Sequence, residues 1–216
     1  MQNLDIATIV IIAANVIISM KGFNDLAFFE KYKFNIAGIR RGEHIRMFSS
    51  AFLHADFSHL LFNMLTLYFF APVVISYVGV TFFVIIYVLS LLAGNLLSFY
   101  FHKNEYHYSA IGASGAVMGV LYSAILFEPN MRLYLFFIPI AIPAWLFGMA
   151  YLLYSIYGMK KRLGNIGHDA HIGGAVGGYV LTLLFAPSLF TTSLWIVALL
   201  AIPLVILFIM YKMGKL

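Results

Sequence analysis

Cysteine is absent from this sequence of 216 residues, and charged side chains are scarce at 10%. Without cysteine there is no disulfide, no thiolate nucleophile and no iron–sulfur cluster, and the common structural zinc sites are excluded as well. Any nucleophile must therefore be a hydroxyl group. The charged fraction is far below the roughly 25% of a soluble globular domain. The scarcity of charge thus excludes an ordinary soluble fold.

What the sequence does contain is apolar surface. Apolar residues make up 63% of the chain, and the mean hydropathy is +0.96. Apolar runs of about twenty residues recur almost from end to end, which is the length that a helix needs to cross a bilayer. The first run has Asp5 at its start rather than a basic segment, so we expect a retained span and not a cleaved signal peptide.

Hydropathy and helix breakers predict an all-α polytopic membrane protein with seven spans. The expected spans are 4–20, 59–78, 80–101, 113–128, 133–158, 169–187 and 191–211. No internal repeat or linker divides the chain, so we expect a single transmembrane domain over 1–216. In it, residues 1–187 form a six-helix core and residues 188–216 an appended seventh helix. Pro139 and Pro143 are expected to bend the fifth span.

The one long connection, residues 21–58, is rich in charged and aromatic side chains. Aromatic rings are expensive in water and natural at the level of lipid headgroups, so we expect this loop to lie in the membrane interface. The formal net charge of +5 comes from basic residues scattered over short loops. Because they form no stripe or tail, we expect membrane lipids as neighbours and no nucleic acid.

Polar residues gather at the starts of three even-numbered spans. His59 and Asn63 open the second span, Ser114 opens the fourth and His171 opens the sixth. A polar side chain inside a span costs a few kcal/mol, so such exceptions indicate function. Successive helices alternate in direction, and even-numbered helices therefore enter from the same membrane face. The four residues are thus expected to share one depth.

These residue types suit acyl transfer. His59 and Asn63 are spaced i, i+4, so both can direct donors at one spot. Ser114 lies where a helix begins, among unsatisfied backbone N–H groups and at the positive end of the helix dipole. A serine that attacks a carbonyl, a histidine that takes its proton and donors that hold the oxyanion form such a site. His171 is the candidate base.

Glycines could bring the serine and the histidine together. Gly115 and Gly119 form a small-xxx-small face on the fourth span, and Gly174 and Gly178 form one on the sixth in phase with His171. Helices without such glycines stay about 8–10 Å apart at their axes, which is too far for a serine and a histidine to bond easily. The same motif also serves plain helix packing in many membrane proteins.

Other roles for the polar residues are weaker. A metal site built on His168 and His171 lacks a third ligand and the glutamate of a zincin motif, so we expect no metal and no cofactor. Asp169 invites a triad, but on a helix it points about 160° away from His171, and an exposed carboxylate at a helix start has a simpler role there. A Ser–His dyad is therefore expected. His54 is expected to bind loop backbone groups.

Taken together, the motifs resemble the rhomboid family of intramembrane serine proteases. The resemblance lies in Gly112-x-Ser114-Gly115, in His59-x-x-x-Asn63 and in His171 followed by small residues, in that order. It covers roughly residues 4–187. The resemblance implies that Ser114 is the nucleophile and His171 the base, with His59, Asn63 and the Ser114 backbone N–H as the oxyanion hole. It also implies transmembrane proteins as substrates.

Two positions depart from the family pattern. Arg46 resembles the family's loop arginine, but Ile45 stands before it where a tryptophan is usual. Met118 stands one turn after Ser114, where the family often has an aromatic side chain that packs on the catalytic imidazole. A thioether can contact a ring edge instead. Every residue that performs chemistry is present, which favours an active protease. Because Met118 departs from the family pattern, the alternative function is an inactive relative that binds client helices.

A transporter or channel would require repeat symmetry, matched broken helices or charges at midspan, and the sequence shows none of these. The resemblance implies a plasma-membrane protein whose active site opens to the extracytoplasmic side. With the active site facing outward, nearly all Lys and Arg residues would also face outward, and Arg132 would be almost alone inside. The positive-inside rule predicts the opposite orientation. We follow the family on this point. The sequence leaves the oligomeric state open.

Overall fold

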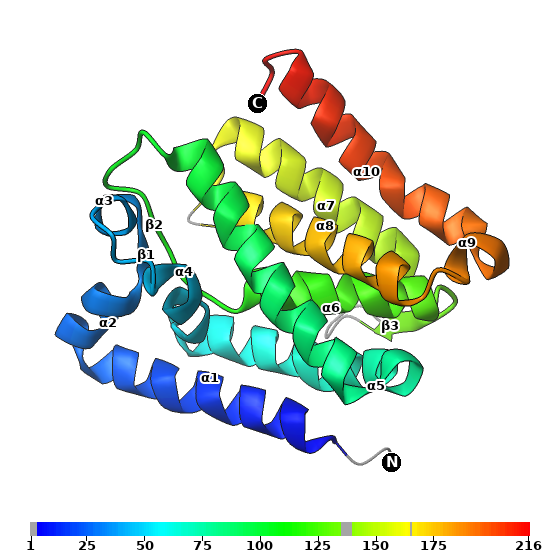
Figure 1. Cartoon of the computed structure of the whole chain (residues 1–216), viewed down its shortest axis with the longest axis horizontal. Coiled ribbons are helices and arrows are strands. Elements are labelled where there is room, and N and C mark those ends of the chain that lie inside the picture. The colour runs from blue at the N-terminus through cyan, green and yellow to red at the C-terminus, as the bar shows by residue number, and fades with distance from the viewer. Residues whose placement is uncertain (1–3, 135–139, 165) are drawn as a thin grey trace.

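The computed structural model describes residues 4–134, 140–164 and 166–216. Long helices dominate these residues, and Figure 1 shows α1 and α10 at opposite edges of the bundle. The long helices are α1 (Ile6–Asn24), α5 (Phe57–His102), α6 (Ser114–Phe127), α7 (Ala144–Lys161), α8 (His168–Phe185) and α10 (Leu194–Lys212). The all-α architecture predicted from hydropathy is confirmed.

The second and third predicted spans are the two halves of α5. The helix is broken at Gly79, whose φ of 76° and ψ of 169° are not helical. A glycine tolerates positive φ because it has no Cβ, so the chain can reverse here without a connecting loop. The break falls between the predicted spans 59–78 and 80–101.

The fifth span differs from the prediction at its N-terminal end. A helix was expected over 133–158, but α7 begins only at Ala144 and is preceded by a hairpin of β3 (Arg132–Tyr134) and β4 (Ala141–Pro143). Pro143 is the residue before the helix rather than a kink within it. Proline lacks an N–H and disfavours helical geometry in the residue before it, so the helix starts after the ring. Pro139 lies outside the described residues.

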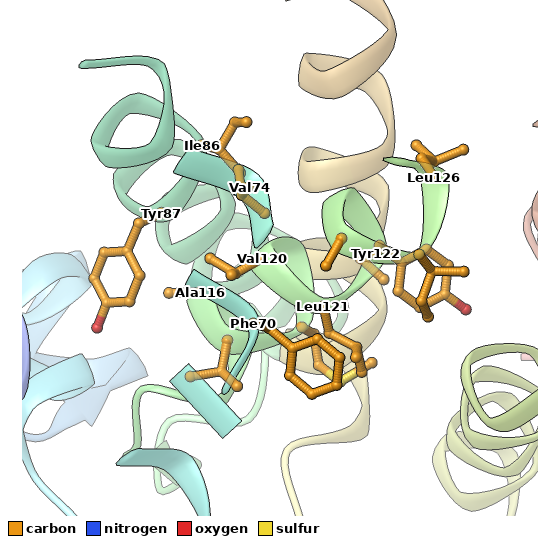
Figure 2. Packing of buried hydrophobic residues seen from close by; sticks show 14 of the residues in the cluster. Phe70, Val74, Ile86, Tyr87, Ala116, Val120, Leu121, Tyr122 and Leu126 are labelled. Carbon is orange, nitrogen blue, oxygen red and sulfur yellow. The ribbon is translucent and has the colours of Figure 1, made fainter. Parts of the chain in front are cut away.

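The core of the protein surrounds α6. Every residue of α6 from Gly115 to Leu126 is buried, and the helix packs mainly on α5 and α8. Figure 2 shows this packing: Phe70, Val74 and Ile86 of α5 lie near Ala116, Val120 and Leu121 of α6. A helix that is apolar all round is stable only where other helices cover it or where lipid surrounds it. The helix that carries Ser114 is therefore the central one.

By length and composition, α1, α5 and α10 are suited to crossing a membrane. Most of their surface faces outward in the described structure, since under a third of each apolar window is buried. Exposed apolar side chains on this scale need a lipid environment. These helices therefore make the protein a multi-pass membrane protein. The division into a core over 1–187 and an appended helix over 188–216 stays a prediction.

The long loop 21–58 is folded rather than irregular. It contains α2 (Leu26–Tyr32), β1 (Phe34–Asn35), α3 (Ile36–Arg40), α4 (Arg46–Ser49) and a 3-10 helix, η1 (Ser50–Phe52). Strand β1 pairs antiparallel with β2 (Ser109–Ala110), which lies just before α6. Phe34, which was expected at the membrane interface with the other aromatics, is fully buried beside Ile36 and Ile39. For the rest of the loop, the interfacial location stays a prediction.

Arg46 holds this loop together. Its Nη1 donates to the carbonyl oxygens of Glu30 and Lys33 at 2.8 and 2.9 Å, and its Nε donates to the carboxylate of Glu43 at 2.5 Å. The guanidinium thus joins the end of α2 to the turn before α4. Arginine suits this role because its rigid fork of donors can bond several oxygens at once. No tryptophan at position 45 is needed for these contacts.

Candidate active site

Ser114 and His171 meet at the starts of two neighbouring helices. Ser114 Oγ lies 2.7 Å from His171 Nε2, which is hydrogen-bond distance. Ser114 is the first residue of α6, and His171 lies in the first turn of α8. They are 57 residues apart in the sequence, and the packing of α6 on α8 brings them together.

The two helices approach so closely because glycines let their backbones touch. A Cβ built on Gly174 would lie 1.9 Å from the carbonyl oxygen of Gly115, and one on Gly178 would lie 2.1 Å from that of Gly119. No side chain larger than hydrogen fits at either contact. The pairs Gly115–Gly174 and Gly119–Gly178 therefore set the separation of α6 and α8, and with it the distance between the serine and the histidine.

His59 comes to the same place from the start of α5. Its Nδ1 accepts a long bond of 3.5 Å from the backbone N–H of Ala55. In a neutral ring the proton then lies on Nε2, which can donate. A Cβ on Gly112 would lie 2.8 Å from this Nε2 and 3.8 Å from Ser114 Oγ. The donor therefore lies beside the serine across Gly112.

Gly112 has a backbone requirement as well as a steric one. Its φ is +116°, a conformation that residues with a Cβ rarely adopt. Its backbone N–H donates to the carbonyl oxygen of Ser50 at 3.0 Å. Gly112 thus turns the chain into α6 while leaving room for the His59 ring.

Asn63 lies one turn after His59, as predicted, and is buried at 6% exposure. Its Nδ2 donates to the His59 carbonyl oxygen at 2.9 Å, and the amide lines the same cavity as Ser114 and His171. One amide hydrogen is used in the helix, and an NH₂ group has two. The second hydrogen is available to a group in the cavity.

His54 holds the loop before Ser114 in place. The backbone N–H of Ala113 donates to His54 Nε2 at 3.4 Å, and His54 Nδ1 lies 2.8 Å from Ser19 Oγ on α1. Because Nε2 accepts, Nδ1 carries the proton and donates to Ser19, whose hydroxyl donates to the Phe52 carbonyl. The histidine binds loop backbone, as expected, and connects α1 to the residues before Ser114.

Asp169 differs from the exposed carboxylate expected at that position. It is buried at 3% exposure, and it accepts a hydrogen bond from the Tyr108 hydroxyl at 3.3 Å. Its Oδ2 also lies 3.6 Å from His102 Nε2. The side chain is buried because the chain between α5 and α6 covers the start of α8. Asp169 thus contacts Tyr108 and His102.

Tyr151 on α7 is the site residue that the sequence did not reveal. Its hydroxyl lies 2.9 Å from His171 Nδ1, so the imidazole is bonded at both nitrogens. Tyrosine is an ordinary residue in an apolar span, and nothing in its spacing distinguished it from Tyr154 or Tyr157. In the structure its ring also stacks with that of Phe147, with centroids 5.9 Å apart.

The residues surround a cavity of about 1010 Å³. Its lining includes the polar residues above and apolar side chains, among them Met118, Leu121 and Phe147. A cavity of this size is large enough for a bound ligand. Among the described residues, no group of three or more His, Asp or Glu side chains could hold a metal ion. The expectations of no metal and no cofactor stay predictions.

Comparison with known proteins identifies the class. Residues 41–188 match the family model described as Rhomboid domain, and this stretch contains Ser114, His171, His59 and Asn63. The chain therefore belongs to the rhomboid family.

Several curated proteins are similar to the chain. It is 33% identical over 137 residues to "Rhomboid protein 1, mitochondrial" of Saccharomyces cerevisiae, over 62% of this chain and 40% of that protein. It is 28% identical over 183 residues to "RHOMBOID-like protein 12, mitochondrial" of Arabidopsis thaliana, over 77% and 54%. The "Putative rhomboid protease YdcA" of Bacillus subtilis is 32% identical over 147 residues, over 68% and 70%. The chain thus matches about half the length of the first two relatives.

Proposed function

We propose that the protein is an intramembrane serine endopeptidase that hydrolyses peptide bonds in or next to transmembrane segments of membrane-protein substrates. The observation that carries this proposal is the 2.7 Å contact between Ser114 Oγ and His171 Nε2 inside a cavity lined by His59 and Asn63. A relative named as a putative rhomboid protease supports it.

In the proposed reaction Ser114 Oγ attacks the scissile carbonyl carbon while His171 Nε2 takes the hydroxyl proton. The carbonyl oxygen becomes an oxyanion, for which His59 Nε2–H, the Asn63 amide and the Ser114 backbone N–H are the donors. As the first residue of α6, Ser114 has no helical partner for its N–H. The C–N bond then breaks as His171 gives its proton to the leaving amine, and the acyl group stays on Ser114 as an ester. A water molecule that loses its proton to His171 attacks this ester, and Ser114 leaves with that proton as the carboxyl product is released.

The substrate class follows from the environment of the site. Backbone groups of a helix in lipid are bonded within the helix, so a peptide bond must leave its helix before a serine can reach the carbonyl. We therefore expect single-span substrates whose helices unwind easily. Membrane lipids are the other expected partners. The plasma membrane and an extracytoplasmic opening remain predictions, and two relatives are named as mitochondrial.

The test is cleavage of a labelled single-span substrate in proteoliposomes by the wild-type protein, Ser114→Ala and His171→Ala, with fluorophosphonate labelling in parallel. Ser76→Ala and His107→Ala are matched controls, because both residues are exposed and outside the cavity. We expect the wild type and the controls to cleave and to label, and the two site variants to do neither. Equal cleavage by Ser114→Ala would overturn the mechanism. If neither the wild type nor any variant cleaves the substrate or is labelled, the protein is better explained as an inactive binder of client helices.

A further inference from the structure

The imidazole of His171 is bonded at both ring nitrogens, and its second partner is unusual for a serine hydrolase. Nε2 contacts Ser114 Oγ at 2.7 Å, and Nδ1 contacts the hydroxyl of Tyr151 at 2.9 Å. In serine hydrolases with a triad, a carboxylate occupies the position beside Nδ1. Here the carboxylate closest in sequence, Asp169, bonds to Tyr108 instead. A neutral phenol thus takes the place of an acid.

We propose that Tyr151 is the positioning residue of the site, which rests on the function proposed above. Its hydroxyl oxygen accepts the hydrogen bond from Nδ1–H and leaves the lone pair of Nε2 directed at Ser114. When the serine proton moves to Nε2, both ring nitrogens carry hydrogen, and Tyr151 remains the acceptor at Nδ1. The phenol stays neutral throughout, and no proton passes to it.

The position of Tyr151 is set by two contacts of α7. Three residues before Tyr151, the Gly148 carbonyl oxygen accepts a hydrogen bond of 2.8 Å from the buried Tyr122 hydroxyl on α6. At the other end of α7, Gly158 lies against the ring of His168, which a Cβ would approach to 2.3 Å. These contacts fix the rotation of α7 against α6 and α8. The hydroxyl of Tyr151 is thereby held at Nδ1.

The same arrangement accounts for Met118. A methionine one turn after Ser114 cannot offer an aromatic face to the imidazole, so the orientation of the ring needs another source. The described ring contacts of His171 are with Tyr151, at 5.7 Å between centroids and 35° between planes, and with His168 at 6.4 Å. The tyrosine therefore supplies both a ring neighbour and a hydrogen-bond partner, and it does so from α7 rather than from α6.

Tyr151→Phe tests this role because it removes only the hydroxyl and keeps the ring in the cavity. Tyr157→Phe is the matched control: it makes the same change on the same helix at an exposed position outside the cavity. Each variant is compared with the wild type, Ser114→Ala and His171→Ala in proteoliposomes. The measurements are kcat, KM, the rate of fluorophosphonate labelling and the melting temperature.

We expect Tyr151→Phe to lower kcat and the labelling rate by about tenfold or more, because it removes a hydrogen bond to the imidazolium that forms in the reaction. The KM should stay at the wild-type value, and Tyr157→Phe should be fully active. A purely structural role would lower the melting temperature at unchanged kcat and labelling rate, and a binding role would raise KM at unchanged kcat. Either result overturns the positioning role.

The failure of this inference is distinguishable from the failure of the proposed function. If Ser114→Ala and His171→Ala are inactive while Tyr151→Phe has wild-type kcat, the dyad stands and the role of Tyr151 is wrong. If Ser114→Ala cleaves as fast as the wild type, the proposed mechanism is wrong, and the role of Tyr151 fails with it.

Discussion

Gly174→Ala should separate α6 from α8 and disconnect the serine from its base. The new Cβ would lie 1.9 Å from the Gly115 carbonyl oxygen, whereas ordinary contact begins at 3.4 Å. The helices must therefore open by about 1.5 Å at this level, because both atoms belong to rigid helix backbone. Gly174 lies one turn after His171. The 2.7 Å contact between Ser114 and His171 would then exceed the hydrogen-bond range of about 3.2 Å.

The expected loss follows from the role of the base. General base catalysis contributes about a hundredfold or more to the rate, so we expect Gly174→Ala to lower kcat and fluorophosphonate labelling by that factor. Overpacking should also reduce stability by about 1–3 kcal/mol, measured by thermal unfolding in detergent. Gly167→Ala is the matched control, since a Cβ there makes only an ordinary contact of 3.6 Å. If both Gly174→Ala and Gly167→Ala keep the wild-type kcat, the backbone contact between Gly174 and Gly115 does not set the distance between Ser114 and His171.

Two further outcomes are expected. Gly112→Ala would force a φ of +116° on alanine and place its Cβ 2.7 Å from the His59 ring. The rate of cleavage should therefore fall by about a hundredfold, because an oxyanion donor is displaced. An unchanged kcat would exclude that role for His59. The hydrogen bond from Arg46 holds the pKa of Glu43 below its ordinary value of 4.5. This contribution to loop stability is present above pH 4.5 and is lost as the pH falls through the lowered value. Limited proteolysis of the loop should therefore be faster in acid than at neutral pH. The Glu43→Gln variant should be cleaved at neutral pH as fast as the wild type is in acid.

Much of the site could be predicted from the sequence because polar residues are expensive in an apolar span. Ser114, His171, His59 and Asn63 are visible as exceptions in apolar runs, and the alternation of helix direction gives them a common depth. The structure brings Ser114 and His171 into contact, and all four residues line one cavity. Their catalytic roles remain proposals.

Tyr151 and Asp169 show why the rest could not be predicted. An aromatic residue in an apolar span is unremarkable, and its hydrogen bond to His171 depends on the rotation of α7, which the contact between Tyr122 and Gly148 sets. Likewise, only the path of the chain over the start of α8 explains why Asp169 is buried beside Tyr108. Both features depend on tertiary packing between segments distant in sequence.

The start of the predicted fifth span was missed for a local reason. Hydropathy is the same for an apolar hairpin as for an apolar helix, so the run from 133 onward was assigned to the helix. The start of α7 after Pro143 depends on backbone chemistry that hydropathy does not measure. By contrast, Gly79 divides α5 close to where the hydropathy profile divided spans 59–78 and 80–101.

The packing of α8 against α6 also has a consequence for synthesis. A ribosome makes the chain from its amino terminus, so α5 and α6 enter the membrane before α8 exists. During that interval Ser114 is present but its partner, 57 residues later, is not. Under the proposed function, a partly made chain would carry the nucleophile without its base, and the pair is complete only when α8 packs beside α6.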